Sequence, residues 1–425
     1  MKASHDCGST ADPRQTLTKE DAINFLLVWV DPITDTERVP TAAGYGRVLA
    51  SAVTSTIDVP GWDNSAMDGY AIRHAELAVH GGRLRVAQRI PAGRVGAALE
   101  PGTAARIFTG APVPAGADTV VIQEVCARAG ETVIVPLDAK VGANIRRAGE
   151  DIHSGVEVIA AGTRLAPQHL GLAASIGAAE ICVHRRLRVA ILASGDELAT
   201  PGEPLGPGQI YNSNRYTLIG LLQSLGCEVV DLGIVADTLD ATMDALRIGA
   251  READLIVASG GVSVGEEDHL KPAVERLGTL DLWNIAMRPG KPVAFGRIGE
   301  TPFFGSPGNP VSLFVTFCLF ARPIILKMQG IHGDPRPRAL KIRAGFDWPK
   351  PDQRTEFHRA RLETGEDGQT ELTVYPSRSS AVLSSVAWAD GLVEIAPGQR
   401  IQRGDEVDFI PFANLFQGFT QEASR

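Results

Sequence analysis

The sequence predicts a multidomain protein of mixed α/β and β class. It is expected to have a central α/β domain with a parallel sheet, a mainly β inserted domain and a C-terminal β domain. Three observations predict this. The 425 residues exceed what a single hydrophobic core usually supports. Residues 187–329 alternate between strand and helix patterns, as parallel α/β sheets do. The segments on either side hold short Val/Ile runs between Gly and Pro turns, which is typical of β structure.

The first ordered element is expected to be a helix that begins at Thr18. Thr18 and Asp21 resemble a capping box, in which a hydroxyl and an acid satisfy the free N–H groups of the first turn. Apolar residues then follow at helical spacing, at Ala22, Ile23, Leu26, Leu27 and Val30. Pro32 is expected to end the helix.

A mainly β module is expected from Val53 to about Arg147, because short apolar runs alternate there with turns. The runs are residues 84–87, 105–108, 119–124 and 132–136. A helix at 167–175 is expected to lead out of this module.

The central domain is expected to contain a parallel sheet. Leu187–Ala193 is an apolar run, as expected of a strand buried on both faces. The other expected strands are 228–235, 255–258 and 303–304, and the expected helices are 214–225, 239–253, 269–277 and 310–328. Such sheets bind ligands at the carboxyl ends of their strands. From Pro335 onward, short strands and turns predict a terminal β domain.

Bulk composition excludes some classes of function. The hydrophobic fraction of 44% and the charged fraction of 21% are ordinary for a globular protein. The net charge of −9 argues against a nucleic-acid binder, which usually has a basic surplus. The five scattered cysteines fit neither a disulfide framework nor a zinc site. We therefore expect free, buried thiols and a cytoplasmic location.

No membrane segment is expected. Residues 1–15 are polar and lack the apolar core of a signal peptide. The most apolar stretch, Val311–Ala321, is too short to span a bilayer and is followed by Arg322 and Pro323. It is interpreted as a buried helix.

Two loops follow expected strands and could bind a metal or a phosphate. Residues 194–197 form a Gly turn with two acids, which suits a hydrated Mg²⁺; the alternative is an exposed acidic turn. Residues 259–268 are rich in glycine and end in Asp268. Backbone N–H groups of such a loop can bind phosphate oxygens, although many such loops are merely tight turns. Asp268 could bind the metal or cap the next helix.

Two further segments of the central domain suit anions. Pro310 fits the first position of a helix, so the helix N-terminus would face residues 305–309 and favour an anion. A purely structural cap is equally compatible. Arg288 and Lys291 lie in a rigid Arg-Pro-Gly-Lys-Pro segment and could capture phosphate or another oxyanion. The alternative is a solvated basic turn.

Two polar segments, Asn64–Ala71 and Asn144–Asp151, stand out beside the β module. Each could instead be a salt-bridged turn of little energetic weight. Eight strings occur in order along most of the chain: NSAMDGYA, FTGAPVP, NIRRAGEDI, SGDEL, IYNSNRY, SGGVSVGEED, RPGKPVAFG and GSPGNPVS. This series resembles the molybdopterin molybdenumtransferase family, which includes the bacterial MoeA proteins and the E domain of gephyrin.

The resemblance implies a fold and an activity. Members are homodimers of four-domain subunits with an active site in a cleft shared between subunits. They release AMP from adenylylated molybdopterin in a Mg²⁺-dependent step and leave molybdenum from molybdate on the pterin. Possible protein partners are a molybdopterin adenylyltransferase and molybdoenzymes. The implied domains are residues 16–57 with 149–186 (linker and dimerisation), 58–148 (inserted β domain), 187–331 (α/β molybdopterin-binding domain) and 332–425 (C-terminal β domain).

The resemblance also assigns roles by motif match. The catalytic residues would be Asp68, Glu197, Asp237, Asp268 and Lys291. The metal ligands among them would be Glu197, Asp237 and Asp268. The pterin and phosphate pocket would be shaped by Ser259, Gly260, Gly261, Ser263, Pro307, Gly308, Asn309 and Pro310. Thr109, Arg146 and Asp151 would approach with Asp68 from the β module, and Arg288, Arg359 and Ser380 would bind anions with Lys291.

The chain departs from the family pattern at four positions. Asn284 stands where a basic residue is frequent, Arg288 replaces a Lys, Ser379 a Gly and Ser194 a Thr. Two alternative functions are a molybdopterin adenylyltransferase and a non-catalytic molybdopterin-binding carrier or scaffold. An adenylyltransferase would not need the Asn64–Ala71 and Asn144–Asp151 segments or the terminal β domain. The sequence does not distinguish molybdate from tungstate.

Overall fold

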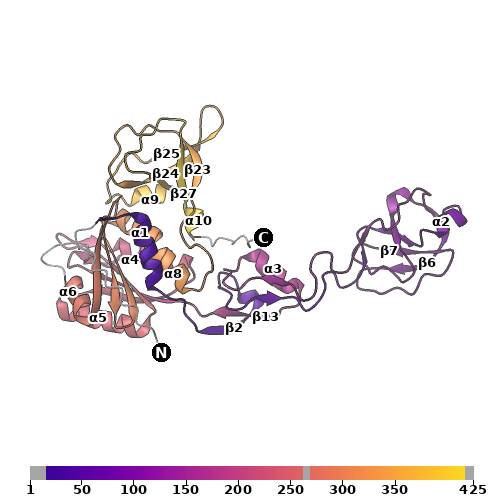
Figure 1. The fold of residues 1–425 in the computed structure, drawn as a ribbon, viewed down its shortest axis with the longest axis horizontal. Coiled ribbons are helices and arrows are strands. Elements are labelled where there is room, and N and C mark those ends of the chain that lie inside the picture. Colours follow the sequence, from indigo (N-terminus) through magenta and orange to yellow (C-terminus); the bar gives the residue numbers. More distant parts are fainter. Residues whose placement is uncertain (1–15, 262–268, 417–425) are drawn as a thin grey trace. The chain divides into compact units, whose positions relative to one another are not determined.

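The computed structural model describes residues 16–261 and 269–416. The chain divides into two compact units. The larger unit comprises residues 1–51, 161–166 and 182–425, and the smaller unit comprises residues 52–160 and 167–181 (Figure 1). The four domains expected from the sequence stay a prediction.

A seven-stranded sheet organises the larger unit, in the order β1-β19-β21-β22-β18-β14-β17. Its strands are β1 (Thr16–Leu17), β14 (Arg188–Ser194), β17 (Glu228–Val235), β18 (Leu255–Ser259), β19 (Gly278–Ile285), β21 (Pro292–Ile298) and β22 (Thr301–Ser306). The neighbours β22, β18, β14 and β17 are parallel, so the predicted parallel sheet is confirmed. The antiparallel strands β19 and β21 extend it.

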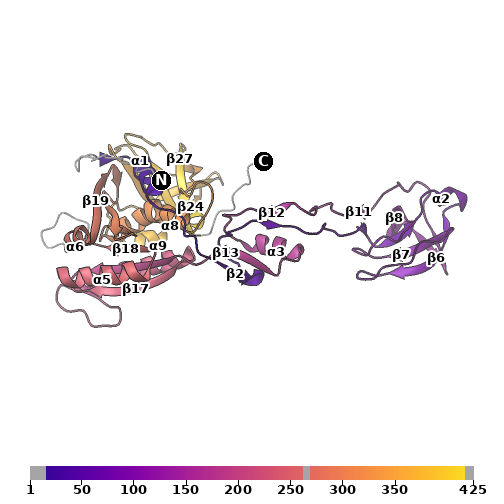
Figure 2. The same ribbon diagram turned by 60° about the horizontal axis from the view of Figure 1, so that its bottom comes forward.

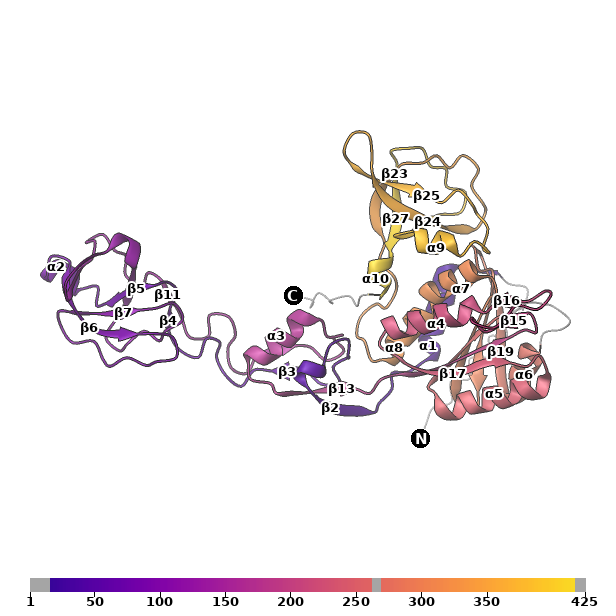
Figure 3. The ribbon, with the colours of Figure 1, turned by 180° about the vertical axis from the view of Figure 1, so that it is seen from behind.

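Helices cover both faces of this sheet (Figure 3). The helices are α1 (Lys19–Trp29), α4 (Ser213–Ser224), α5 (Leu239–Glu252), α6 (Leu270–Leu277), α7 (Pro310–Thr316) and α8 (Arg322–Met328). On β14, Val189 and Ile191 belong to the core under α1, α4, α7 and α8. Ala190 and Leu192 belong to the core under α5 and α6. The strand is therefore buried on both faces, as predicted.

Helices α7 and α8 are joined by a π-helical segment, Phe317–Ala321. Pro323 lies in the first turn of α8. Because proline has no N–H and its ring crowds the preceding turn, a wider turn before it relieves the mismatch. The whole helix, Pro310–Met328, is long and apolar enough to cross a membrane. However, 94% of its apolar 18-residue stretch is buried inside the structure. The interpretation as a buried helix is confirmed.

The C-terminal part folds into a six-stranded β structure, which confirms the predicted terminal β domain. Its strands are β20 (Met287–Arg288), β23 (Leu340–Ala344), β24 (Thr355–Thr364), β25 (Thr370–Val374), β26 (Gly391–Ile395) and β27 (Glu406–Pro411). The order is β20-β24-β25-β23-β27-β26, and β26 also pairs with β24, which closes the sheet. Two short helices accompany it, α9 (Ser384–Trp388) and α10 (Phe412–Phe416). Strand β20 comes from the Arg288–Lys291 segment and ties that segment to this sheet.

The smaller unit is mainly β, as predicted. Its six-stranded sheet, in the order β8-β5-β7-β6-β10-β9, comprises β5 (Gly69–Ile72), β6 (Arg83–Ile90), β7 (Thr103–Ile107), β8 (Thr119–Ile122), β9 (Ala127–Ala129) and β10 (Thr132–Ile134). Its helices are α2 (Glu76–Val79), a 3₁₀ turn (Gln123–Val125) and α3 (Pro167–Ser175). Short ladders join β3 (Val53–Thr54) to β12 (Glu157–Ile159), and β4 (Asn64–Ser65) to β11 (Ile145–Arg146). The remaining short elements of the chain are β2 (Thr36–Pro40), a 3₁₀ turn (Thr41–Ala43), β13 (Glu180–His184), β15 (Leu198–Ala199) and β16 (Ile210–Tyr211).

The four cysteines in the described residues carry free thiols, as expected. Cys227 and Cys318 are buried, and burial raises the pKa of each thiol to about 12. Cys126 and Cys182 are only partly buried, so the expectation of burial holds for two of the four. Cys7 lies outside the described residues.

The predicted helix start at Thr18 is confirmed, because its side chain accepts a hydrogen bond from the N–H of Asp21 at 3.1 Å. We expect Thr18→Ala to lower the free energy of unfolding by about 1 kcal/mol, the usual cost of losing such a cap. Urea denaturation measures the change. Thr34→Ala, in the exposed loop after α1, is the matched control. Equal stability of the two variants would contradict the capping role.

Candidate functional site

The motifs of the α/β part begin at one edge of its sheet. The register aligns Ala193 of β14 with Ser259 of β18, and Ser259 with Ser306 of β22. Since these strands are parallel, the loops that follow them leave the sheet side by side. This edge is where open α/β sheets bind ligands.

Two of these loops are in contact through glycine. The N–H of Gly260 donates to the carbonyl oxygen of Ser306 at 3.0 Å. A Cβ on Gly308 would lie 3.7 Å from the Cα of Gly260, so the two backbones approach closely. Gly260 has a φ of +86° and Gly261 one of +68°, a left-handed conformation that glycine adopts without strain.

Asn214, at the start of α4, connects the same two loops. Its Nδ2 donates to Ser259 Oγ at 2.9 Å and to the carbonyl oxygen of Gly308 at 2.7 Å. Its Oδ1 is buried and has no partner in the described structure. Sequence reasoning placed this residue only in a helix. The available signal was its position in the IYNSNRY string.

Two of the three acids predicted to bind metal, Glu197 and Asp237, lie at the same edge. Ser194 Oγ donates to Asp237 Oδ1 at 3.2 Å, so the last residue of β14 holds the half-buried acid that follows β17. A Cβ on Gly195 would collide with the carboxylate of Glu197, which folds back over this glycine. No group of three His, Cys, Asp or Glu side chains suited to a metal occurs within residues 16–261 and 269–416. Ser263 and Asp268 lie outside the described residues.

The N-terminus of α7 meets a loop of the C-terminal β structure. Pro310 occupies the first turn of the helix, as predicted. The N–H of Val311 donates to the carbonyl oxygen of Ser380 at 3.0 Å. One of the helix's free N–H groups is therefore satisfied by the protein itself. The contact places Ser380 beside Pro307, Gly308 and Asn309, the residues that lead into α7.

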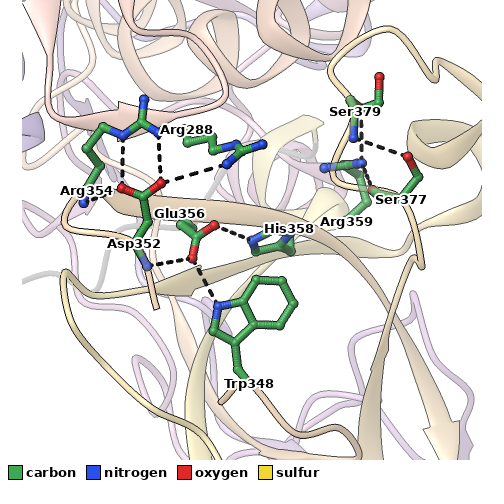
Figure 4. A network of polar contacts seen from close by, with 9 residues as sticks. All are labelled: Arg288, Trp348, Asp352, Arg354, Glu356, His358, Arg359, Ser377 and Ser379. Atoms are coloured by element: carbon green, nitrogen blue, oxygen red, sulfur yellow. Dashed lines mark hydrogen bonds and ion pairs between the residues drawn. The ribbon is translucent and has the colours of Figure 1, made fainter. Parts of the chain in front are cut away.

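Arg359, on β24, forms hydrogen bonds with the loop of residues 377–380 (Figure 4). Its side chain is 1% exposed. It donates to Ser385 Oγ at 2.9 Å and to the carbonyl oxygens of Ser377 and Ser379 at 2.5 and 3.4 Å. Burial lowers the pKa of this guanidinium. The arrangement shows Arg359 as an anchor of residues 377–380; its predicted contact with an anion is untested.

The side chains of Arg288 and Lys291 are accessible to solvent. Arg288 pairs with Asp352 at 3.8 Å, and Arg354 binds the same carboxylate at 2.8 Å (Figure 4). The hydrogen bond from Arg354 lowers the pKa of Asp352 to about 2. Lys291 is exposed, and its carbonyl oxygen accepts from the N–H of Ile285 at 2.8 Å. This bond places Lys291 next to Asn284, the residue that departs from the family pattern.

A buried polar group lies between these two regions and was missed from the sequence. Glu356 accepts from Trp348 Nε1 at 3.0 Å and lies 3.3 Å from His358 Nε2 (Figure 4). Burial lowers the pKa of His358 to about 4, against the attraction of Glu356. The only signal in the sequence was that Glu356 and His358 are two residues apart, so that they share one face of a strand.

We expect the neutral state of His358 to make stability depend on pH. The folded chain protonates this imidazole only near pH 4, whereas the unfolded chain does so near 6.5. Between these values the unfolded chain binds more protons, so acidification favours unfolding. Lowering the pH from 7 to 5 should cost about 1–2 kcal/mol through this residue. Urea denaturation at both pH values should show a smaller loss in His358→Gln; an unchanged loss would contradict the assignment.

The smaller unit brings together two of the predicted site residues. Asp68 accepts from the backbone N–H and from the hydroxyl of Thr109, both at 2.8 Å. These bonds, the backbone one first, lower the pKa of Asp68, and the charge of Arg106 lowers it further. The carboxylate is therefore ionised at neutral pH.

The other two predicted residues of this unit lie on its surface. Arg146 is exposed on β11, opposite Asn64 of β4, and Asp151 is exposed in the segment that follows. The neighbouring Arg147 pairs with Asp63 at 2.5 Å, and Asp63 also accepts from the N–H of Ala148 at 2.9 Å. The segment is therefore a salt-bridged turn, as the sequence allowed.

Comparison with known families accounts for nearly the whole chain. Residues 17–177 match the family described as "MoeA N-terminal region (domain I and II)". Residues 190–327 match "Probable molybdopterin binding domain", and residues 341–412 match "MoeA C-terminal region (domain IV)". The matched regions contain all the loops described above.

Curated proteins and solved structures are similar over the same length. The chain is 38% identical to a molybdopterin molybdenumtransferase of Haemophilus influenzae, over 94% of this chain and 99% of the relative. It is 39% identical to one of a Nostoc species, over 90% of each. The crystal structure of the molybdopterin biosynthesis moeA protein from Pyrococcus horikoshii OT3 is 28% identical, with a TM-score of 0.80, covering 93% of this chain and 100% of that one.

Proposed function

The chain belongs to the molybdopterin molybdenumtransferase family, and we propose that it transfers molybdenum from molybdate onto adenylylated molybdopterin with release of AMP. The product is molybdenum cofactor. The observation that carries this proposal is that three loops, residues 259–261, 306–309 and 377–380, contact the N-termini of α4 and α7. Asn214 of α4 binds the first two loops, and Val311 of α7 binds the third.

The proposed resident cofactor is Mg²⁺. This ion uses one or two protein carboxylates and completes its coordination with water and substrate phosphates. Asp237 and Glu197 supply two carboxylates at the edge of the sheet where the phosphate loops begin, so the donor set fits. Together with Asp268 they would hold the ion. Mg²⁺ would there offset negative charge on the phosphate bridge.

The protein groups have separable tasks in this proposal. The backbone N–H group of Gly261 would bind a phosphate oxygen, whereas that of Gly260 donates to Ser306 and holds the loop in place. Arg288, Lys291 and the Ser380 hydroxyl would bind molybdate, because cations and a hydroxyl together suit a small dianion. Arg359 would keep the Ser380 loop seated on α7. The reaction needs no covalent nucleophile, since charge stabilisation and positioning suffice for phosphoryl chemistry.

The remaining expectations stand as proposals. In a homodimer, Asp68, Thr109, Arg146 and Asp151 of one subunit would complete the site of the other. The proposed compartment is the cytoplasm, which the free thiols of the chain suit. Contact with a molybdopterin adenylyltransferase and with recipient molybdoenzymes is also proposed. Light scattering during size-exclusion chromatography measures the oligomeric state.

The two alternatives are less well supported. The chain matches the N-terminal and C-terminal MoeA regions as well as the molybdopterin-binding domain, and an adenylyltransferase would not need them. A non-catalytic carrier would not need the acids at Asp237 and Glu197.

The deciding experiment is AMP release from adenylylated molybdopterin with Mg²⁺, with molybdate added or omitted. Molybdate-stimulated release, with molybdenum appearing on the pterin, is the expected result. Tight binding of the nucleotide without turnover would instead favour a carrier. Tungstate in place of molybdate measures the oxyanion preference.

A further inference from the structure

An unusual pair of arginines lies on the smaller unit. Arg89 of β6 and Arg106 of β7 are directly opposite in the sheet. The guanidinium of Arg89 lies 4.4 Å from the centre of the Phe108 ring, and that of Arg106 lies 4.6 Å from it. Arg106 is also 5.2 Å from the Tyr70 ring. Figure 2 shows β6 and β7 side by side in this unit.

Within residues 16–261 and 269–416, neither arginine forms an ion pair with an acid, although the charge of Arg106 acts on Asp68. Within the described part of the chain, Arg106 donates to the carbonyl oxygen of Gly69 at 3.0 Å and to Gln123. Arg89 is exposed, and its contact in that part of the chain is the stack on Phe108. By contrast, Arg85 on the same strand pairs with Glu100, and Arg73 pairs with Glu76. The N–H edge of Arg89 is thus available to a ligand.

Two adjacent arginines lower the stability of the folded unit unless a bound anion offsets their repulsion. Like charges directly opposite each other in a sheet repel. Each cation gains from the ring it covers, and this fixes the two guanidiniums side by side on Phe108. A fixed pair of cations that forms no ion pair of its own can capture an oxyanion, which Arg binds with two parallel hydrogen bonds.

The pair adjoins a predicted site. Phe108 directly precedes Thr109, which binds Asp68. Arg106 is close enough to Asp68 to influence its carboxylate. Both stacked guanidiniums contact the Phe108 ring, so the ring is not free to stack on a pterin or an adenine. The chemistry of the pair therefore favours the charged part of the substrate over its rings.

We propose that Arg89 and Arg106, held on Phe108, form a phosphate-binding subsite for the phosphate bridge of the adenylylated substrate. This inference rests on the proposed function. Arg89 donates to a phosphate oxygen from its exposed guanidinium, which lies over Phe108, the residue before Thr109. The subsite lowers the concentration of nucleotide that the enzyme needs.

The test compares Arg89→Gln with Arg83→Gln in the full chain. Arg83 is an exposed arginine on the same strand, has no ion pair within residues 16–261 and 269–416, and is the matched control. In AMP-release kinetics, Arg89→Gln should raise the KM for adenylylated molybdopterin about tenfold, the effect of one charge-assisted contact. The kcat and the molybdate concentration for half-maximal rate should stay within about twofold, and Arg83→Gln should match the unsubstituted chain.

Direct binding of ADP, a diphosphate probe, to the same three chains by calorimetry separates this proposal from the proposed function. If the unsubstituted chain releases no AMP, the proposed function fails, but weaker ADP binding by Arg89→Gln alone still supports the subsite. Equal ADP affinity and equal KM in both variants would overturn it. A raised molybdate requirement with an unchanged KM for the nucleotide would overturn it as well, by assigning the pair to molybdate.

Discussion

Asp237→Asn is expected to lower the rate of Mg²⁺-dependent AMP release by at least about 100-fold. Asp237 follows β17, and its side chain reaches the end of β14, where Ser194 Oγ donates to it. Asp237 lies at the edge of the sheet where the loops proposed to bind phosphate begin. Its hydrogen bond with Ser194 fixes the orientation of its carboxylate. Asparagine keeps the shape of the side chain but removes its charge. The nucleotide should therefore still bind, and a higher Mg²⁺ concentration should not restore the full rate of AMP release.

Two further variants sharpen this test. Ser194→Ala removes the hydrogen bond to Asp237 but not its charge, so a smaller loss of about tenfold is expected. Asp240→Asn changes an exposed acid in the first turn of α5 and should behave like the unsubstituted chain. Activity of Asp237→Asn comparable to that of Asp240→Asn would remove Asp237 from the metal site.

Much of the α/β part was predictable because its signals are local. Residues 187–193 were predicted as a strand buried on both faces, and the side chains of β14 do enter two different cores. The helix expected over residues 214–225 does end before Gly226, which has a φ of +77°. Pro310 was predicted to start a helix and does. Each of these depends on a few neighbouring residues, which a single sequence displays.

The missed strands depend on partners far away in the chain. Gly69–Ile72 lies within a polar motif, yet it is an interior strand of the sheet in the smaller unit. A Cβ on Gly69 would collide with the carbonyl oxygen of Val121 on β8, so glycine is needed for strand contact and not for a turn. Met287–Arg288 likewise looks like part of a loop, and only β24 makes it a strand.

The site was predictable as a set of loops but not as a set of contacts. The carboxyl ends of parallel strands had to meet, and they do. No spacing could show that Asn214 links Ser259 to Gly308, because a hydrogen bond between distant segments leaves no local pattern. The burial of Arg359 was hidden for the same reason, since its acceptors lie on other segments of the chain.

Arg359→Met is expected to lower the free energy of unfolding by about 2–3 kcal/mol, because methionine leaves the buried acceptors of a charged donor without partners. It is also expected to raise the molybdate concentration for half-maximal rate at least about tenfold. The loop of residues 377–380 would lose its anchor, and Ser380 would no longer be held on α7 at the N–H of Val311.

Arg361→Met separates these two effects. Arg361 lies on the same strand and donates to the carbonyl oxygen of Trp388 at 3.0 and 2.8 Å, with its guanidinium 4.7 Å from that residue's ring. Its loss should also reduce stability, but at the end of α9 and not at the Ser380 loop. We therefore expect urea denaturation to show losses in both variants, and molybdate titration to show a shift in Arg359→Met alone. Equal molybdate shifts would mean that Arg359 acts only through general stability, and the proposed oxyanion site would then depend on Arg288 and Lys291.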